Sequence, residues 1–198
     1  MASVHATLLS QKSLLRDGGC ANTLKLDAGC GSTPQGDVNC DLFIRDPGHR
    51  TGKRDKPGEI LDPKRIKNFV VCDVERLPFR DEVFDEVYAS HVIEHVNDPA
   101  LFLHELLRVS SLHVTVLCPH RIGDKLLNPP NPFHKNYFGA RWFETAMRVL
   151  GCSGVVTISQ VKTWPSNLVH LLHVPFEIRA DFYKSKVLSY GYKDSQNP

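Results

Sequence analysis

The run KLDAGCGS, residues 25–32, constrains the fold more than any other stretch of this chain. A strand-like start leads into Asp27 and then into Gly29 and Gly31. Glycine adopts positive φ and lets backbone approach a ligand closely, and open α/β sheets bind nucleotide-like ligands at the carboxyl ends of their strands. The run therefore predicts a ligand-binding turn, although a strand followed by an ordinary glycine-rich turn fits the same letters. It matches neither GxGxxG nor GxxxxGKS/T, which argues against a dinucleotide or a P-loop phosphate.

Three further strand-like runs each lead to polar side chains. In chain order these side chains are Asp41, Asp73 and the group His91, Glu94 and His95. Because the carboxyl ends of parallel strands meet at one edge of a sheet, we expect the four runs to bring these groups together.

These runs resemble class I S-adenosylmethionine-dependent methyltransferases of the type 11 group. The resemblance is carried by LDAGCG, VNCD and CDVERLPFRDEVFDEVYASHVIEHV, and its most specific part is D-x-E-x-LPF followed by FD-x-V. It covers roughly residues 23–152, and residues 134–152 resemble that group's late helix and its approach loop. It implies a Rossmann-like, doubly wound α/β fold with a mostly parallel seven-stranded sheet and an antiparallel C-terminal edge.

The resemblance also implies an enzyme, a transferase that uses S-adenosyl-L-methionine and releases S-adenosyl-L-homocysteine. Asp27 and the glycine pair would hold the cofactor's ammonium end, and Asp41 would accept the ribose hydroxyls. The expected cofactor-binding residues are Asp27, Gly29, Gly31, Asp41, Asp73, Val74 and His91. Thr33 stands where the family commonly has a third glycine. Only residues 29–36 separate the first two strands, so the usual crossover helix is expected to be missing or reduced to a turn.

Bulk properties suit one soluble domain over residues 1–198. The hydrophobic share is 41% and the net charge is +2, so charge alone predicts no nucleic-acid partner. No apolar run is long enough to cross a membrane, and the N-terminus lacks the pattern of a secretion signal. The six cysteines lack zinc-ligand spacing, which favours free thiols in a reducing, cytoplasmic compartment.

Several segments outside the four runs have a predicted structure. A helix over 7–16, within an N-terminal helical segment 1–20, should pack on the sheet. Further helices are expected over 98–109, with Asp98 as its N-cap, and 140–150. Strands are expected over 23–28, 37–41, 68–72, 85–89 and 112–118, with two more near the C-terminus. Residues 120–138 are expected to form a long substrate-side loop.

The segment 43–67 is rich in proline and glycine and carries eight basic and four acidic residues. A solvated loop is one interpretation, and a weak contact with nucleic acid is the other.

Candidate catalytic residues follow the fourth and fifth strands. His120 is the first choice for a general base, with His91 and Tyr137 as further candidates. Glu94, His95, His134 and Lys135 are expected on the substrate side. The acceptor is not legible, and a substrate that needs no base is an alternative. His91 and His95 have i, i+4 spacing, but no third metal ligand stands at recognisable spacing, so no metal is predicted.

A non-catalytic cofactor-binding protein and a nucleic-acid-binding protein on the same fold remain alternative functions. The oligomeric state is left open.

Overall fold

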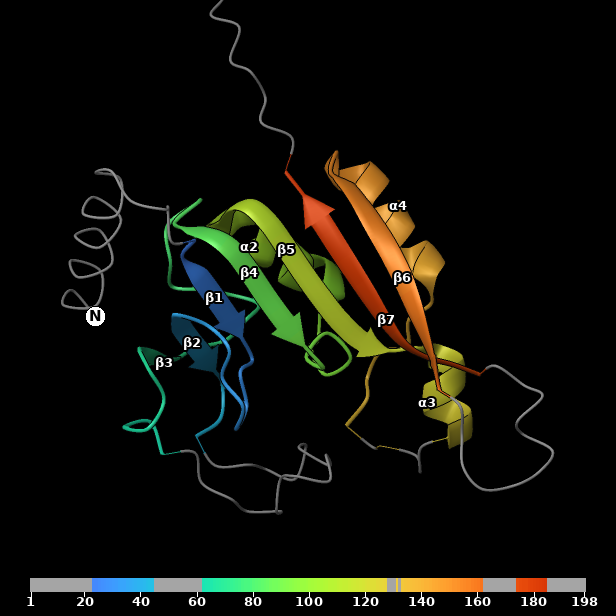
Figure 1. The fold of residues 1–198 in the computed structure, drawn as a ribbon, viewed down its shortest axis with the longest axis horizontal. Helices are drawn as coiled ribbons and strands as arrows, with labels where there is room; N and C mark the ends of the chain where they lie inside the picture. Colours follow the sequence, from blue (N-terminus) through green and yellow to red (C-terminus); the bar gives the residue numbers. More distant parts are fainter. Residues whose placement is uncertain (1–22, 45–61, 128–130, 132, 162–173, 185–198) are drawn as a thin grey trace, which may run out of the picture.

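The computed structural model describes residues 23–44, 62–127, 131, 133–161 and 174–184. They form one seven-stranded sheet with the strand order β3-β2-β1-β4-β5-β7-β6 (Figure 1). The strands are β1 (Lys25–Ala28), β2 (Val38–Asp41), β3 (Phe69–Val71), β4 (Phe84–Ser90), β5 (Ser110–Pro119), β6 (Ser153–Val161) and β7 (Val174–Tyr183). Strands β1 to β5 are parallel, and β7 lies antiparallel between β5 and β6. The predicted sheet with its antiparallel C-terminal edge is confirmed.

The connection between β1 and β2 is as short as the sequence predicted. Residues 29–37, all of them described, contain turns and bends but no helix. The buried side chain of Asn39 holds this connection, because its Oδ1 accepts a 2.9 Å hydrogen bond from the amide of Gly36 and its Nδ2 donates to the carbonyl of Gly36 at 3.0 Å. Nδ2 also donates to the carbonyl of Lys67 at 2.8 Å. One buried amide therefore satisfies backbone groups that would otherwise lack partners.

One face of the sheet is apolar and carries two helices. Helix α2 (Pro99–Val109) begins at Asp98, whose side chain accepts hydrogen bonds from the amides of Ala100 and Leu101, as predicted. Helix α4 (Ala140–Leu150) packs on β6 and β7 (Figure 1). The core residues of the two helices are Phe102, Leu103, Leu106, Phe143 and Met147, and the strand residues beneath them include Val87, Val114, Val116, Ile178 and Phe182.

Alternate residues of β5 and β7 place polar groups on the opposite face. Asp181 accepts a 2.7 Å hydrogen bond from Thr115 and pairs with Arg179 at 2.8 Å. The rings of His113 and Tyr183 stack with centroids 4.7 Å apart. Alternation along these strands separates this polar surface from the apolar core.

The prediction of an uninterrupted loop over 120–138 is wrong, because residues 121–127 form helix α3 (Arg121–Leu127). The sequence RIGDKLL has apolar residues at helical spacing, and the prolines that suggested a loop begin only at Pro129. Gly123 allows α3 to lie against β7, since a Cβ there would come within 2.5 Å of the carbonyl oxygen of Pro175.

Some predictions concern segments outside the described residues. These are the N-terminal helix, most of the basic insertion at 45–61, and the start of the last strand before residue 174. Cys20 also lies there, and the other five cysteines form no disulfide within the described part of the chain. Among the described helices, none is long and apolar enough to span a membrane.

Candidate functional site

The carboxyl ends of β1 and β2 build a turn around two acids. Gly29 and Gly31 have φ values of 77° and 53°, a backbone conformation that favours glycine. Asp41 Oδ2 accepts a hydrogen bond of 3.0 Å from the amide of Gly31, and Asp41 Oδ1 accepts one of 3.0 Å from Phe43. Asp27, at the end of β1, accepts one of 2.8 Å from the amide of Gln35. The two predicted acids therefore lie in neighbouring strands and shape the turn directly.

Asp27 is almost fully buried, and its surroundings alter its titration. Burial raises the pKa of its carboxyl to about 6, and the negative charge of Asp41 adds to the rise. The Gln35 amide and the charge of Lys25 oppose it. A cationic ligand beside Asp27 would stabilise the ionised carboxylate and reverse this effect.

The loop after β3 holds the predicted adenine-side residues. Asp73 begins a turn, with its Oδ1 accepting a 2.9 Å hydrogen bond from the amide of Glu75. Val74 and Leu77 are buried. Glu75, which the sequence analysis did not single out for the site, accepts hydrogen bonds from the amides of Asn97 (3.2 Å) and Asp98 (2.7 Å). The loop is thereby tied to the start of α2.

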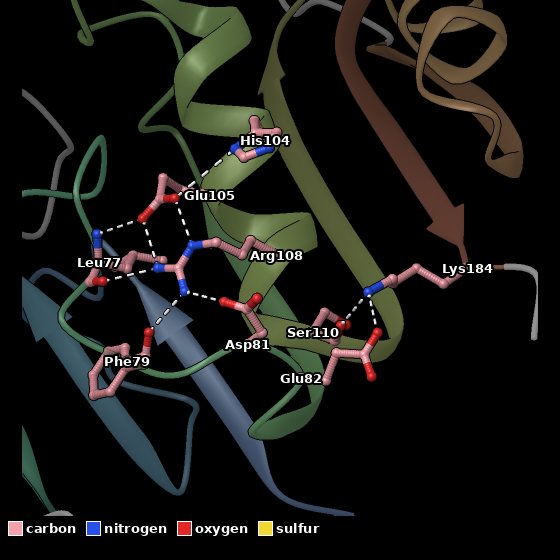
Figure 2. A network of polar contacts seen from close by, with 9 residues as sticks. All are labelled: Leu77, Phe79, Asp81, Glu82, His104, Glu105, Arg108, Ser110 and Lys184. Carbon is pink, nitrogen blue, oxygen red and sulfur yellow. Dashed lines mark hydrogen bonds and ion pairs between the residues drawn. The ribbon is translucent and has the colours of Figure 1, made fainter.

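Arg108 on α2 fixes the other end of this loop (Figure 2). Its guanidinium makes a two-point contact with Glu105, at 2.7 and 2.8 Å. It also donates to the carbonyls of Leu77 (3.0 Å) and Phe79 (2.8 Å). Glu105 in turn accepts from the amide of Leu77 at 2.9 Å, and Arg108 lowers the pKa of the Glu105 carboxyl. The LPF part of the sequence motif is therefore a loop clamped by an ion pair.

His91 follows β4 in a constrained position. Its φ is 56°, unusual for a residue with a side chain. Its Nε2 lies 3.0 Å from Glu177 Oε2, and its Nδ1 lies 3.4 Å from Glu94 Oε1. The hydrogen bond to Glu177 and then the ion pair with Glu94 raise the pKa of His91 to about 10, so the ring is a cation near neutral pH. This charge argues against His91 as a general base.

The predicted substrate-side residues come together around Glu94. The amides of Lys135 and Asn136 donate to the Glu94 carbonyl at 2.8 and 3.1 Å, so residues 133–136 lie across the turn after β4. His95 Nδ1 lies 3.0 Å from the Phe133 carbonyl oxygen, and the His95 and His134 rings are 4.9 Å apart. This turn also touches the glycine turn, since a Cβ on Gly29 would lie 2.3 Å from Val92.

His120 is buried at the start of α3 and has a structural role there. Its Nδ1 accepts a 3.2 Å hydrogen bond from the amide of Ile122. A neutral ring in this arrangement carries its proton on Nε2 and presents a donor. Burial, with the charge of Arg121, lowers the pKa of His120.

Tyr137 lies on the surface beside α3. It is 47% exposed, and the Lys125 ammonium stands 4.9 Å from its ring centroid. The fold brings His120 near the segment that contains Tyr137. His120 forms an isolated β-bridge with Phe138, and the backbone amide of Arg121 donates to the Phe138 carbonyl at 2.8 Å.

Comparison with known proteins agrees with the architecture. Residues 47–113 match the family described as "methyltransferase domain". No curated protein matches the sequence significantly. A methyltransferase from Archaeoglobus fulgidus superposes with a TM-score of 0.58 at 15% identity, covering 92% of this chain and 94% of that one.

Two other solved structures have the same fold. A Thermotoga maritima S-adenosylmethionine-dependent methyltransferase, titled a possible histamine N-methyltransferase, gives a TM-score of 0.57 at 18% identity over 92% and 89% of the two chains. The magnesium protoporphyrin IX methyltransferase of Synechocystis, solved with bound S-adenosylhomocysteine, gives 0.52 at 13% identity over 93% and 83%. The resemblance to class I methyltransferases and the fold it implies are confirmed.

Proposed function

We propose that this chain is a methyltransferase that binds S-adenosylmethionine at the carboxyl edge of β1, β2 and β3 and transfers its methyl group to an acceptor; the domain match and the fold support the proposal. The observation that carries this proposal is the arrangement of the first two strand ends. Two acids flank a turn of positive-φ glycines, and Asp41 accepts the amide of one of those glycines at 3.0 Å.

The residues present fit the cofactor's polar groups. Asp27 is buried beside the turn and would face the ammonium, which restores the charge that burial disfavours. Asp41 would accept the ribose hydroxyls, because a carboxylate has two acceptor oxygens with about four lone-pair sites and can accept hydrogen bonds from ligand and backbone together. Asp73, Val74 and Leu77 would line the adenine with one polar group and two apolar ones.

The cofactor supplies an activated methyl group, so the protein's task is chiefly to position the acceptor and exclude water. The turn after β4 contacts the glycine turn through Val92. We assign the positioning of the acceptor to four residues in and beside this turn: Glu94, His95, His134 and Lys135. His120 and Tyr137 are proposed to border the acceptor from α3 and the segment that follows it. His91, held as a cation between two carboxylates, is proposed to fix the turn after β4 and to supply positive charge at the cofactor edge.

Calorimetry with S-adenosylhomocysteine tests the binding half of the proposal. We expect one molecule to bind per chain, with loss of affinity in Asp41→Ala. Transfer of a labelled methyl group to small molecules, lipids, protein and RNA tests the catalytic half. Binding without transfer to any acceptor would support the alternative of a non-catalytic cofactor-binding protein. Absence of binding would contradict both.

A further inference from the structure

Glu94 has an unusual environment for a carboxylate. Its side chain is 2% exposed, and neither oxygen has a hydrogen-bond partner among the described residues. His91 Nδ1 stands at an ion-pair distance of 3.4 Å from Oε1. Among the described residues, no cationic group lies at such a distance from Oε2. A buried carboxylate without hydrogen bonds is costly, and proteins commonly offset that cost with a second cation or a metal ion.

Two histidines lie beside this carboxylate. One ligand atom each from Glu94, His95 and His134 lies within 4.8 Å of the other two. The ligands of a single zinc ion, each roughly 2.1 Å from the metal, stand roughly 3.5 Å apart. A contraction of about 1 Å, within the reach of small side-chain rotations, brings the three atoms to a spacing of that size.

Both rings also have an oxygen at hydrogen-bond distance from Nδ1. His134 Nδ1 lies 2.8 Å from Asp124 Oδ2 on α3, and the two side chains are 9% and 7% exposed. His95 Nδ1 lies 3.0 Å from the carbonyl oxygen of Phe133. A hydrogen bond that keeps the proton on Nδ1 leaves Nε2 as the ligand nitrogen, and a carboxylate or carbonyl in this place is the usual support of a metal-bound histidine.

We propose that Glu94, His95 and His134 form a binding site for one divalent first-row transition-metal ion, with Asp124 orienting His134. Two imidazoles and one carboxylate suit zinc or ferrous iron better than magnesium, which prefers oxygen ligands. Three protein ligands leave at least one coordination position for an outside oxygen or nitrogen donor. The site adjoins the cofactor edge through Val92 and Gly29, yet the proposal does not depend on methyl transfer.

The test uses the full chain, stripped of metal with a chelator and titrated with Zn²⁺ by calorimetry and with Co²⁺ by absorption spectroscopy. We expect one equivalent of each ion to bind. Glu94→Gln, which keeps the side chain's shape, should lose more affinity than the roughly 10- to 100-fold expected for the supporting change Asp124→Asn. His104→Ala, which removes an exposed histidine on α2 (62% side-chain exposure), should bind like the wild type.

Two controls distinguish metal binding at Glu94 from a folding defect and from metal binding elsewhere on the chain. Saturating Zn²⁺ should raise the melting temperature of the wild type but not of Glu94→Gln, while metal-free Glu94→Gln still unfolds in a cooperative transition with the circular dichroism of the metal-free wild type, so a folding defect would be detected. The proposal is overturned if the wild type binds no stoichiometric ion, or if Glu94→Gln binds as tightly as the wild type. A thiolate charge-transfer band in the cobalt spectrum would also overturn it, because the ion would then sit on cysteine.

Discussion

The carboxylate of Asp41, at the end of β2, accepts a 3.0 Å hydrogen bond from the amide of Gly31, in the turn that follows β1. Its second oxygen accepts the amide of Phe43 at 3.0 Å. The residue proposed to hold the cofactor's ribose therefore also fixes the turn around the cofactor's other end. Binding and local folding are coupled through one side chain.

Replacing Asp41 by alanine should affect both properties. We expect S-adenosylhomocysteine affinity to fall by about 1.5–3 kcal/mol, the range for hydrogen bonds to a charged group. The unliganded chain should lose about 1–2 kcal/mol of unfolding free energy, since two backbone amides lose their acceptor. Calorimetry and chemical denaturation measure the two effects.

Asp37→Ala is the matched control for this change. Asp37 precedes β2, at the opposite end of the strand, and its Oδ2 accepts the amide of Lys25 at 3.1 Å. It should lose stability but not cofactor affinity. Equal loss of affinity in the two variants would show that Asp41 acts only through the fold.

Asp27 should make cofactor binding depend on pH. Its pKa is raised to about 6 by burial, with Asp41 adding to the rise and Lys25 and the Gln35 amide opposing it. A bound ammonium requires the ionised form, so binding below pH 6 releases a proton. We therefore expect S-adenosylhomocysteine affinity to fall by up to about tenfold per pH unit below that point. Asp27→Asn should bind more weakly at pH 7 and show a flatter profile between pH 5 and 7. An unchanged slope in this variant would assign the titration to another group.

Arg108 should stabilise the chain and position the adenine-side loop at the same time. Arg108→Lys cannot reproduce the two-point contact with Glu105 together with two carbonyl bonds, so we expect the unfolding free energy to fall by about 1–2 kcal/mol. Affinity for S-adenosylhomocysteine should fall as well, because the Leu77 carbonyl loses its hydrogen bond from Arg108. Arg148→Ala, on the exposed end of α4, is the control and should change neither quantity. Loss of stability with full affinity would restrict Arg108 to the fold.

Local sequence patterns predicted the parts of this molecule that depend on neighbouring residues. Asp98 before a run of leucines indicated the start of α2, and the short spacing between Asp27 and Asp41 indicated a crossover without a helix. Asp27 and Asp41 lie at the edge of the sheet because each stands at the end of a strand. The apolar residues before each acid and the glycines after Asp27 indicated where these strands end. These features need no knowledge of distant contacts.

The remaining features depend on pairs that are far apart in the sequence. Glu94 and His134 are 40 positions apart in the sequence, and His91 contacts Glu177, which lies on β7. Neither pair can be recognised from a local sequence pattern. Helix α3 was missed because the proline-rich letters after Leu127 outweighed the helical spacing before them. His120 was chosen for its place after β5, yet its bond to the Ile122 amide depends on the helix that the sequence did not predict.

That bond allows a capping role for His120 to be separated from a catalytic one. His120→Ala should lower the unfolding free energy by about 0.5–2 kcal/mol, as loss of a cap does, and should also lower turnover with little change in cofactor affinity. His120→Asn supplies an oxygen that accepts the Ile122 amide, so it should recover the stability but not the turnover. Tyr137→Phe, which keeps the ring beside Lys125, should lower turnover at unchanged stability. Thermal melting, calorimetry and a labelled-methyl assay with an acceptor found by screening measure the three quantities. If His120→Asn restores turnover together with stability, His120 serves the fold alone, and the acceptor-side role passes to the residues around Glu94.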